Sequence, residues 1–265
     1  MRAMAVMGVV PVSLALLLSA CGPLASPTVT SRVREMRASH PVARVVAGPV
    51  APDPRVGAFF LAGGDLHTCT GSVLDSVGGD LVLTAAHCLG GGTQPTFVPG
   101  FGGRTAPDDT WTVDAVYLDP RWIAGRDPHA DYAIARVSRR GGGSVQARAG
   151  AGLTLGLAPA RNSRVRVIAY QAGVGGTPIG CQASTGITSP GYPSLRCAGL
   201  VDGTSGAPWI SGSTVVGLIG GLDGGGCGEE LSYSAPFDEH IAWLLQRAEA
   251  GGPGDAAPAD FDDGC

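Results

Sequence analysis

From residue 56 onward the chain alternates short apolar and β-branched runs with glycine- and proline-rich turns, a pattern typical of an all-β sandwich or barrel. Residues 139–152 include a polar, glycine-rich run that is too flexible for a core strand, so we place a linker between two β-domains there. The strands that the pattern predicts span residues 56–62, 71–74, 81–83, 111–117, 132–137, 164–170, 184–187, 194–197, 208–210, 215–219 and 231–234.

One helix is predicted near the end of the chain, over residues 238–248. Asp238 is a suitable N-cap, and apolar residues then recur at the i, i+3, i+4 and i+7 spacing of one helix face, at Ile241, Leu244, Leu245 and Ala248. Residues 251–265 combine several aspartates with glycine, alanine and proline. This composition predicts an acidic tail that is tethered, if at all, by Cys265.

Residues 1–20 carry a single charge, at Arg2, followed by an apolar run, which predicts an export signal that is not part of the fold. The segment ends Leu18-Ser19-Ala20-Cys21-Gly22, which resembles the lipobox of bacterial lipoproteins, where the cysteine becomes the lipid-bearing first residue. That resemblance implies a mature protein anchored to the membrane through Cys21. The alternatives are free secretion after an ordinary signal peptide and an uncleaved anchor. Residues 21–54 are interpreted as a linker or short propeptide.

Composition and charge narrow the function classes. Hydrophobic residues make up 44% of the 265 residues, which is enough for packed cores and too much for a disordered protein. The net charge is −4, and the 18 basic residues, all arginine, form no basic stripe, so nucleic-acid binding is not expected. The seven cysteines contain no C-x-x-C pair, so no metal site is predicted; a lipidated Cys21 would leave an even number for disulfides.

The candidate chemistry centres on Ser205, which lies between Gly203-Thr204 and Gly206-Ala207. A serine hydroxyl is a weak nucleophile, so it needs a base within hydrogen-bond reach and a third group that orients the base. The segment Thr84-Ala85-Ala86-His87-Cys88 offers the base, and Asp131, which precedes the apolar run Tyr132-Ala133-Ile134-Ala135, offers the third group. The order His, Asp, Ser argues against an α/β-hydrolase, in which the serine comes first along the chain. The nucleophile motif of those enzymes also ends in glycine, and Ala207 occupies that position here.

These three motifs, in this order, resemble the chymotrypsin- and trypsin-like serine proteases, particularly the compact bacterial secreted ones, over roughly residues 56–248. The resemblance implies two six-stranded antiparallel β-barrels with a C-terminal α-helix, in residues 55–138 and 153–250, joined by 139–152. It implies that His87 is the general base, Asp131 orients it, and Ser205 attacks the peptide bond. The N–H groups of Gly203 and Ser205 would form the oxyanion hole. It further implies a monomer that uses no cofactor or metal and acts on proteins or peptides.

Several residues compete for these roles. His40, His67, His129 and His240 lack the sequence context of His87. Asp114, Asp119 and Asp127 lie near Asp131, which is preferred because a buried strand follows it. Sequence proximity and the family resemblance favour the disulfides Cys69–Cys88 and Cys181–Cys197. They leave Cys227 to pair with Cys265, unless these two are reduced or paired otherwise.

Substrate choice and activation are less specified. The family's primary pocket would be walled by residues 197–202, 220–222 and 229–232. No aspartate stands clearly at its floor, so a strict preference for Arg or Lys is not expected, and Leu222 would narrow the pocket. Thr204 stands where trypsin-like relatives carry an aspartate that pairs with a freed N-terminus, although Arg44-Val45-Val46-Ala47-Gly48 resembles an activation site.

Two other functions stay open at this point. Thr204 and the undefined pocket leave room for a catalytically silent binding protein with a protease fold. The third hypothesis is an esterase that acts only on small esters.

Because Thr204 has no carboxylate, we predict that the enzyme is active without a new N-terminus.

Overall fold

The computed structural model describes residues 44–61, 64–90, 94–105, 107–188, 190–226, 228 and 230–258. The chain divides into two units, Met1–Val42 and Ala43–Cys265, and the first lies outside the described residues. The export signal, Cys21, His40 and the Cys227–Cys265 pair therefore lie outside them as well. Among the described residues, no helix combines the length and the apolar character needed to cross a membrane.

The first described sheet is a closed antiparallel barrel with the strand order β3-β2-β5-β6-β7-β4. Pairing of Ser72 with Leu83 and of Val73 with Val82 joins β3 to β4 and closes it. Buried aromatic and aliphatic side chains, among them Phe59, Phe97 and Trp111, fill the interior. The strands are β2 (Val56–Phe60), β3 (Leu66–Val73), β4 (Leu81–Thr84), β5 (Thr96–Pro99), β6 (Trp111–Leu118) and β7 (Ala133–Ser138).

The second described sheet curls into a half-barrel with the order β15-β12-β11-β9-β13-β14. Its edges approach where Leu218 N donates to Ser234 Oγ (3.0 Å) and Gly220 N donates to Tyr233 O (3.1 Å). The strands are β9 (Arg164–Ala169), β11 (Ile179–Ile187), β12 (Pro193–Arg196), β13 (Pro208–Ser211), β14 (Thr214–Leu218) and β15 (Leu231–Tyr233). Short strands flank both sheets: β1 (Gly48–Pro49) on β11, β8 (Thr154–Leu155) on β14, and β10 (Gly173–Val174) on β3.

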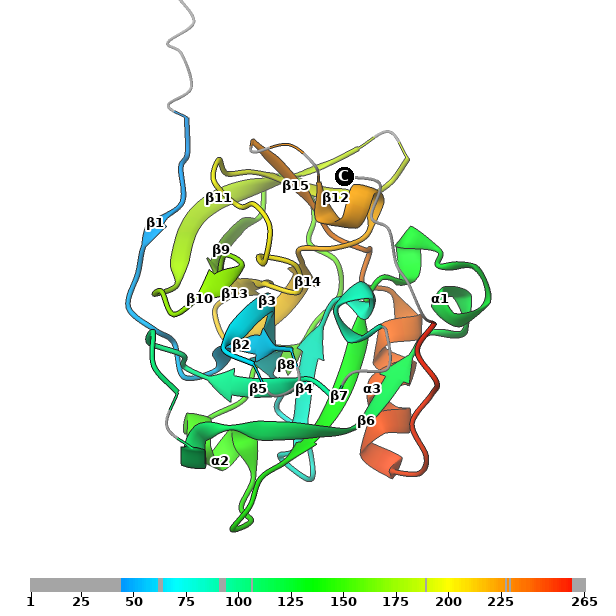
Figure 1. The fold of residues 1–265 in the computed structure, drawn as a ribbon. Coiled ribbons are helices and arrows are strands. Elements are labelled where there is room, and N and C mark those ends of the chain that lie inside the picture. Colours follow the sequence, from blue (N-terminus) through cyan, green and yellow to red (C-terminus); the bar gives the residue numbers. More distant parts are fainter. Residues whose placement is uncertain are drawn as a thin grey trace, which may run out of the picture. The chain divides into compact units, whose positions relative to one another are not determined.

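The expected C-terminal helix is α3 (Glu239–Ala250), which packs beside β6 and β7 of the first barrel (Figure 1). The Asp238 carboxylate caps it by accepting a hydrogen bond from His240 N at 2.9 Å. Ile241, Leu244 and Ala248 are buried, as the apolar spacing predicts. The fold class is therefore confirmed: a mostly β chain with a closed six-stranded barrel, a second sheet that forms a half-barrel, and a C-terminal helix.

Shorter helices were not predicted, because they hold too few residues to show an apolar period. They are α1 (Pro120–Gly125), which Asp119 caps, and α2 (Val145–Ala149), which Ser144 caps within the expected linker. Single turns of 3-10 helix occur at η1 (Ala86–Leu89), η2 (Pro107–Asp109), η3 (Pro128–Ala130) and η4 (Leu222–Gly225).

Both flanking segments are more closely attached than their composition predicts. Residues 44–54, expected to be linker, begin along the second sheet, where Ala47 N donates to Ala198 O (2.8 Å) and Ala198 N donates to Val45 O (2.9 Å). The described part of the acidic tail, residues 251–258, is attached to the first barrel, where Asp255 N donates to Val116 O at 2.7 Å. A hydrogen-bonded backbone can hold such polar segments in place without a buried apolar face.

Candidate active site

The first barrel brings His87 and Asp131 together. Strand β4 ends at Thr84, which pairs with Ala133 at the start of β7, so the segments beyond these residues leave the barrel at the same edge. The turn η1 then carries His87, and η3 ends just before Asp131. His87 Nδ1 lies 2.8 Å from Asp131 Oδ2, and His87 N donates to Asp131 Oδ1 at 3.1 Å. The two residues are thus held by a two-point contact.

The environment of Asp131 keeps its carboxylate charged. Burial, which is complete, would by itself raise its pKa. The attraction to His87 and the hydrogen bonds from His87 and Gly221 outweigh burial, so the pKa of Asp131 is lowered. An ionised carboxylate only accepts hydrogen bonds, so it fixes the proton of His87 on Nδ1 and leaves Nε2 as the basic nitrogen.

The half-barrel of the second sheet, called the second barrel from here on, contributes directly to this pair. Gly221 N donates to Asp131 Oδ2 at 2.8 Å. A Cβ at Gly220 would lie 3.1 Å from Asp131 O and 3.1 Å from Asp131 Oδ2, so the backbone of this glycine lies close against Asp131. These glycines follow β14, in the range 220–222 that was expected to wall the primary pocket. A buried carboxylate with three N–H donors thus lies where the two barrels meet.

Ser205 comes from the second barrel and lies against the strands that carry His87. Thr70 N, on β3, donates to Ser205 O at 2.8 Å. A Cβ at Gly206 would lie 2.1 Å from Thr70 O and 3.0 Å from the backbone nitrogen of Ala85, and Gly206 has a φ of +80°. Only glycine allows this approach. The backbone beside Ser205 therefore contacts the segment that leads to His87 two residues later.

The backbone around Ser205 has free N–H groups. Gly203 has a φ of +87°, and a Cβ there would lie 2.0 Å from Ala172 N, so this position requires glycine. Among the described residues, no hydrogen bond uses the N–H of Gly203 or of Ser205. Their arrangement fits the expected oxyanion hole, in which preorganised donors await the developing negative charge.

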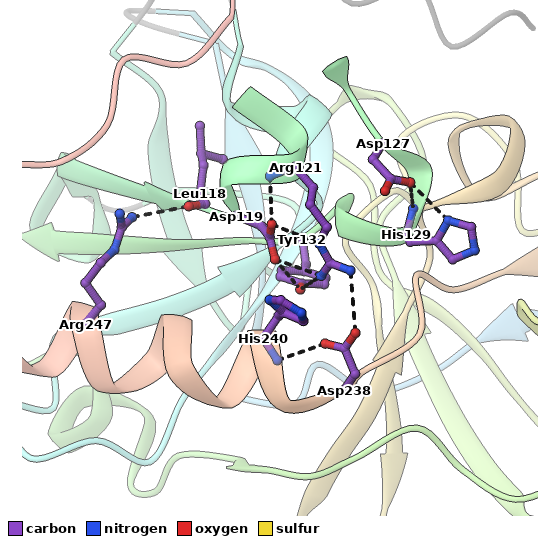
Figure 2. Close-up of polar contacts among 9 residues, drawn as sticks. All are labelled: Leu118, Asp119, Arg121, Asp127, His129, Tyr132, Asp238, His240 and Arg247. Atoms are coloured by element: carbon purple, nitrogen blue, oxygen red, sulfur yellow. Dashed lines mark hydrogen bonds and ion pairs between the residues drawn. The ribbon is translucent and has the colours of Figure 1, made fainter. Parts of the chain in front are cut away.

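A buried polar cluster supports the backbone next to Asp131 (Figure 2). Tyr132 OH donates to Asp119 Oδ2 at 2.8 Å, and Arg121 Nη2 donates to the same oxygen at 2.8 Å. Arg121 Nη1 also lies 3.6 Å from Asp238 Oδ2 at the start of α3. Burial and the hydrogen bond to Asp119 raise the pKa of Tyr132, so this phenol stays protonated. The cluster anchors Tyr132 to α1 and α3, and thereby fixes the chain direction at Asp131.

The competing residues are used elsewhere. Asp119 pairs with Arg121, and Asp114 is exposed. Asp127 Oδ1 accepts from His129 N (2.9 Å) and lies 3.0 Å from His129 Nδ1, so this more exposed pair resembles Asp131 and His87 but uses one carboxylate oxygen for both contacts (Figure 2). Of the four candidate aspartates, Asp131 is the one that the structure places on His87.

The remaining histidines lack a comparable pairing. His67 is buried, and its Nε2 lies 2.8 Å from Gly175 O among aromatic rings of the core. His240 follows the N-cap of α3 and is exposed. Neither contacts the Ser205 segment through a described hydrogen bond.

Two disulfides lie among the described cysteines. Cys69–Cys88 joins β3 to the His87 turn with a Cα–Cα distance of 6.1 Å, and Cys181–Cys197 joins β11 to the end of β12 with 6.7 Å. Ligand atoms of Cys69, His87 and Cys88 lie within 4.8 Å of one another, but disulfide sulfurs are not the thiolates that metals bind. Only the imidazole of this group is available for chemistry.

The expected walls of the primary pocket are largely apolar. Leu200 and Ser232 are buried, and Leu222 is half-buried. The acidic residues Asp202 and Glu230 are exposed, and Glu230 pairs with Arg44 at 2.9 Å. The described part of the wall therefore contains no buried carboxylate that would bind a basic side chain.

Comparison with solved structures defines the fold class. The chain is similar to the protease Anisep from Arthrobacter nicotinovorans, with 22% identity over 78% of this chain and 100% of that one, and a TM-score of 0.67. It is similar to the thermostable serine protease AL20 from an extremophilic microorganism, with 20% identity over 76% and 99% of the chains and a TM-score of 0.64. The human heparin binding protein also matches, with 18% identity over 80% and 100% of the chains and a TM-score of 0.59.

The sequence itself gives the family. A model of the trypsin-like peptidase domain matches residues 69–218, more than half of the chain, and the chain belongs to the trypsin-like peptidase family. A comparison with curated proteins finds no match. The matched segment contains His87, Asp131 and Ser205, and the family acts on protein or peptide substrates as serine-type peptidases.

Proposed function

We propose that the protein is a serine endopeptidase that hydrolyses peptide bonds through a triad of His87, Asp131 and Ser205. The observation that carries the proposal is the buried, ionised Asp131, whose carboxylate accepts hydrogen bonds from His87 on one barrel and Gly221 on the other. Burying a charged carboxylate is costly unless it is paired and hydrogen-bonded, so such a group is a strong functional-site candidate.

The chemistry follows from the orientation of His87. With its proton fixed on Nδ1, the imidazole accepts the Ser205 hydroxyl proton on Nε2 as Oγ bonds to the carbonyl carbon of the substrate. The carbonyl oxygen becomes an oxyanion that accepts hydrogen bonds from the N–H groups of Gly203 and Ser205. His87 then returns the proton to the leaving amine, and the C–N bond breaks to leave an acyl-enzyme on Ser205.

Deacylation repeats the same steps with water. His87 removes a proton from a water molecule that attacks the acyl carbon, and Ser205 Oγ leaves and takes the proton back. Asp131 stays ionised throughout and stabilises the imidazolium, so all atoms and charges balance without a cofactor or metal.

The test is to incubate the mature protein with a denatured proteome and to identify the new N-termini by mass spectrometry. We expect cleavage within chains that is abolished by Ser205→Ala and unchanged by Ser211→Ala, an exposed serine at the end of β13. The cleaved bonds should show no strict Arg or Lys preference, because the described wall lacks a buried carboxylate. Absence of new N-termini from a folded wild-type protein would reject the proposal, and cleavage of small esters alone would favour an esterase.

A silent binding protein is the second candidate, because a heparin binding protein shares the fold. Heparin is a polyanion, and its recognition requires a basic surface. This chain has a net charge of −4, so its charge does not favour that ligand. The binding function is therefore the weaker hypothesis.

We also propose that the protein is exported and carries lipid on Cys21. Disulfides form and persist in oxidising, extracytoplasmic environments, and the described pairs Cys69–Cys88 and Cys181–Cys197 fit that location. Stable anchoring needs more than one acyl chain, as a lipoprotein cysteine supplies. Cys21→Ser should release the protein into the medium or stop its processing. A wild-type protein that is wholly soluble with an unmodified N-terminus would refute the anchor.

A further inference from the structure

Thr70 is a fully buried residue whose backbone N–H and side-chain hydroxyl are both bonded to the second barrel. Its Oγ1 donates to Gly203 O at 3.1 Å and accepts a hydrogen bond from Tyr170 N at 2.9 Å. Its N–H donates to Ser205 O at 2.8 Å, and its carbonyl accepts from Thr84 Oγ1 at 2.8 Å. Thr70 thus links the strand that leads to His87 with the loop that carries Ser205.

The peptide units of this loop show what Thr70 controls. In a trans peptide the C=O and the following N–H point in opposite directions. Asp202 O accepts from Ala172 N at 2.8 Å, which turns the Gly203 N–H the other way. Thr204 O accepts from Ala207 N at 2.9 Å, which does the same for the Ser205 N–H. The two candidate oxyanion donors are therefore oriented by carbonyls that are bonded inside the protein.

The peptide that joins these two donor peptides is the one that Thr70 Oγ1 holds. Its carbonyl belongs to Gly203, which has a positive φ. Because glycine has no side chain, many other backbone conformations are open to it as well. The N–H of the same peptide, that of Thr204, donates to Val201 O at 3.0 Å, so both ends of the peptide are bonded. Without a partner for its carbonyl, the peptide between Gly203 and Thr204 keeps only the Val201 anchor and can tilt about it, and the two donor N–H groups lose their common direction. The Thr70 backbone N–H also fixes the Ser205 carbonyl, so Thr70 holds the loop on both sides of Thr204.

We propose that Thr70 is the positioning residue of the oxyanion hole: its hydroxyl fixes the Gly203 carbonyl so that the N–H groups of Gly203 and Ser205 converge on the substrate. This inference rests on the proposed function and deepens it. It assigns to the first barrel a role in building a site that otherwise consists of second-barrel backbone.

The test compares Thr70→Val, which removes the hydroxyl with little change in shape, with Thr70→Ser, which keeps it. The matched control is Thr185→Val on β11. Thr185 is also buried, at 2% exposure, and its Oγ1 likewise donates to a carbonyl, Ala160 O (2.7 Å), and accepts from an amide, Ser163 N (3.1 Å). Both valine variants lose the same kinds of hydrogen bond, so a general structural effect would appear in both.

Kinetics should separate the two valine variants. Removing one oxyanion donor typically costs about 10²–10³ in kcat, so misdirecting the donors in Thr70→Val should lower kcat by about 10–100-fold with KM nearly unchanged. A peptide boronate, which forms a tetrahedral adduct, should bind this variant more weakly by a similar factor. Thr70→Ser should recover most of the rate, and Thr185→Val should keep wild-type kcat per folded molecule. Equal kcat in Thr70→Val and Thr185→Val would overturn the proposal.

A second measurement keeps this inference distinct from the proposed function. Amide hydrogen exchange, followed by mass spectrometry on peptides covering residues 200–207, needs no catalysis. We expect faster exchange in Thr70→Val than in Thr70→Ser or Thr185→Val, even if the wild-type protein cleaves no peptide. A wild-type protein without peptidase activity would reject the proposed function, whereas unchanged exchange in Thr70→Val would reject the role of Thr70.

Discussion

Replacing Asp131 by asparagine removes one charge from the candidate site and keeps the size of the side chain. The Asp131 carboxylate accepts hydrogen bonds from three donors: Oδ2 receives His87 Nδ1 and Gly221 N, and Oδ1 receives His87 N. An asparagine has one oxygen, so its NH₂ group must face at least one of these buried N–H groups. In either orientation of the amide, a donor meets a donor.

The two orientations predict the size of the effect. If the amide oxygen takes the Oδ2 position, His87 keeps its tautomer but loses the negative charge that stabilises the imidazolium. If the NH₂ group takes that position, His87 must accept on Nδ1, its proton moves to Nε2, and the base is lost. The same aspartate-to-asparagine change in the Ser-His-Asp triad of a serine protease lowers kcat by about 10⁴-fold, which corresponds to about 5.5 kcal/mol in the activation free energy. The unpaired buried donor costs about 1–3 kcal/mol of stability.

The matched control is Asp127→Asn. Asp127 also contacts the backbone N–H and the imidazole of one histidine, His129, but through a single oxygen, Oδ1. Its side chain is 38% exposed, so water can replace any lost interaction. We expect wild-type kcat for this variant. The assay is kcat and kcat/KM on a peptide found in the cleavage screen, together with urea unfolding to measure stability. A fully active Asp131→Asn enzyme, or an equal loss of kcat in Asp127→Asn, would refute the assignment of Asp131.

Three further predictions concern stability and activation. Reduction should inactivate the enzyme by loosening the His87 turn, and replacing Cys69 and Cys88 by alanine should lower the free energy of unfolding by about 3 kcal/mol in denaturant titrations; native Cys69 and Cys88 thiols in peptide maps would contradict this. Burial alone would raise the pKa of Asp53 above its ordinary 3.8. Hydrogen bonds from Arg55 and Arg166 outweigh burial and lower the pKa to about 2. The lowered pKa contributes about 2 kcal/mol of stability, which is present at pH values above 3.8 and is lost as the pH falls towards 2. Asp53→Asn should therefore destabilise the protein near neutral pH and much less near pH 2. Equal losses of unfolding free energy at the two pH values would contradict this prediction. A mature chain with Arg44→Gln, shown by intact mass to be uncut, should retain its full active-site titre, because the Ser205 loop is held by Thr70; an inert form that gains activity only after cleavage before Val45 would overturn this.

The strands and the C-terminal helix could be predicted because their local patterns agree with the fold. Each predicted strand range overlaps an observed strand, and Asp238 caps α3 as expected. Strand β5 (Thr96–Pro99) was missed because it is short and has no clear alternation before its proline. The attachment of the acidic tail was missed because it depends on backbone hydrogen bonds to Val116 and on Arg247, and a composition argument does not contain these pairings.

The residues of the candidate site also fall into two groups: those that a local motif predicts, and those whose roles depend on contacts between distant segments. His87 and Asp131 could be predicted because each lies in a recognisable motif, and the structure brings them together. Thr70 and Gly221 could not be found, because their roles depend on contacts between segments that are distant in sequence. The glycine pair before Leu222 was a signal for close backbone approach, but the sequence did not indicate that Asp131 was the group approached.

The most direct test of the central claim is labelling of the mature protein with a fluorophosphonate, followed by peptide mapping. The account predicts one phosphonate adduct, on Ser205 Oγ, because His87 makes that hydroxyl nucleophilic and the N–H groups of Gly203 and Ser205 bind the phosphonyl oxygen. Labelling should disappear in Ser205→Ala and persist in Ser211→Ala. A folded wild-type protein that takes up no label, or a label that survives Ser205→Ala, would contradict the account.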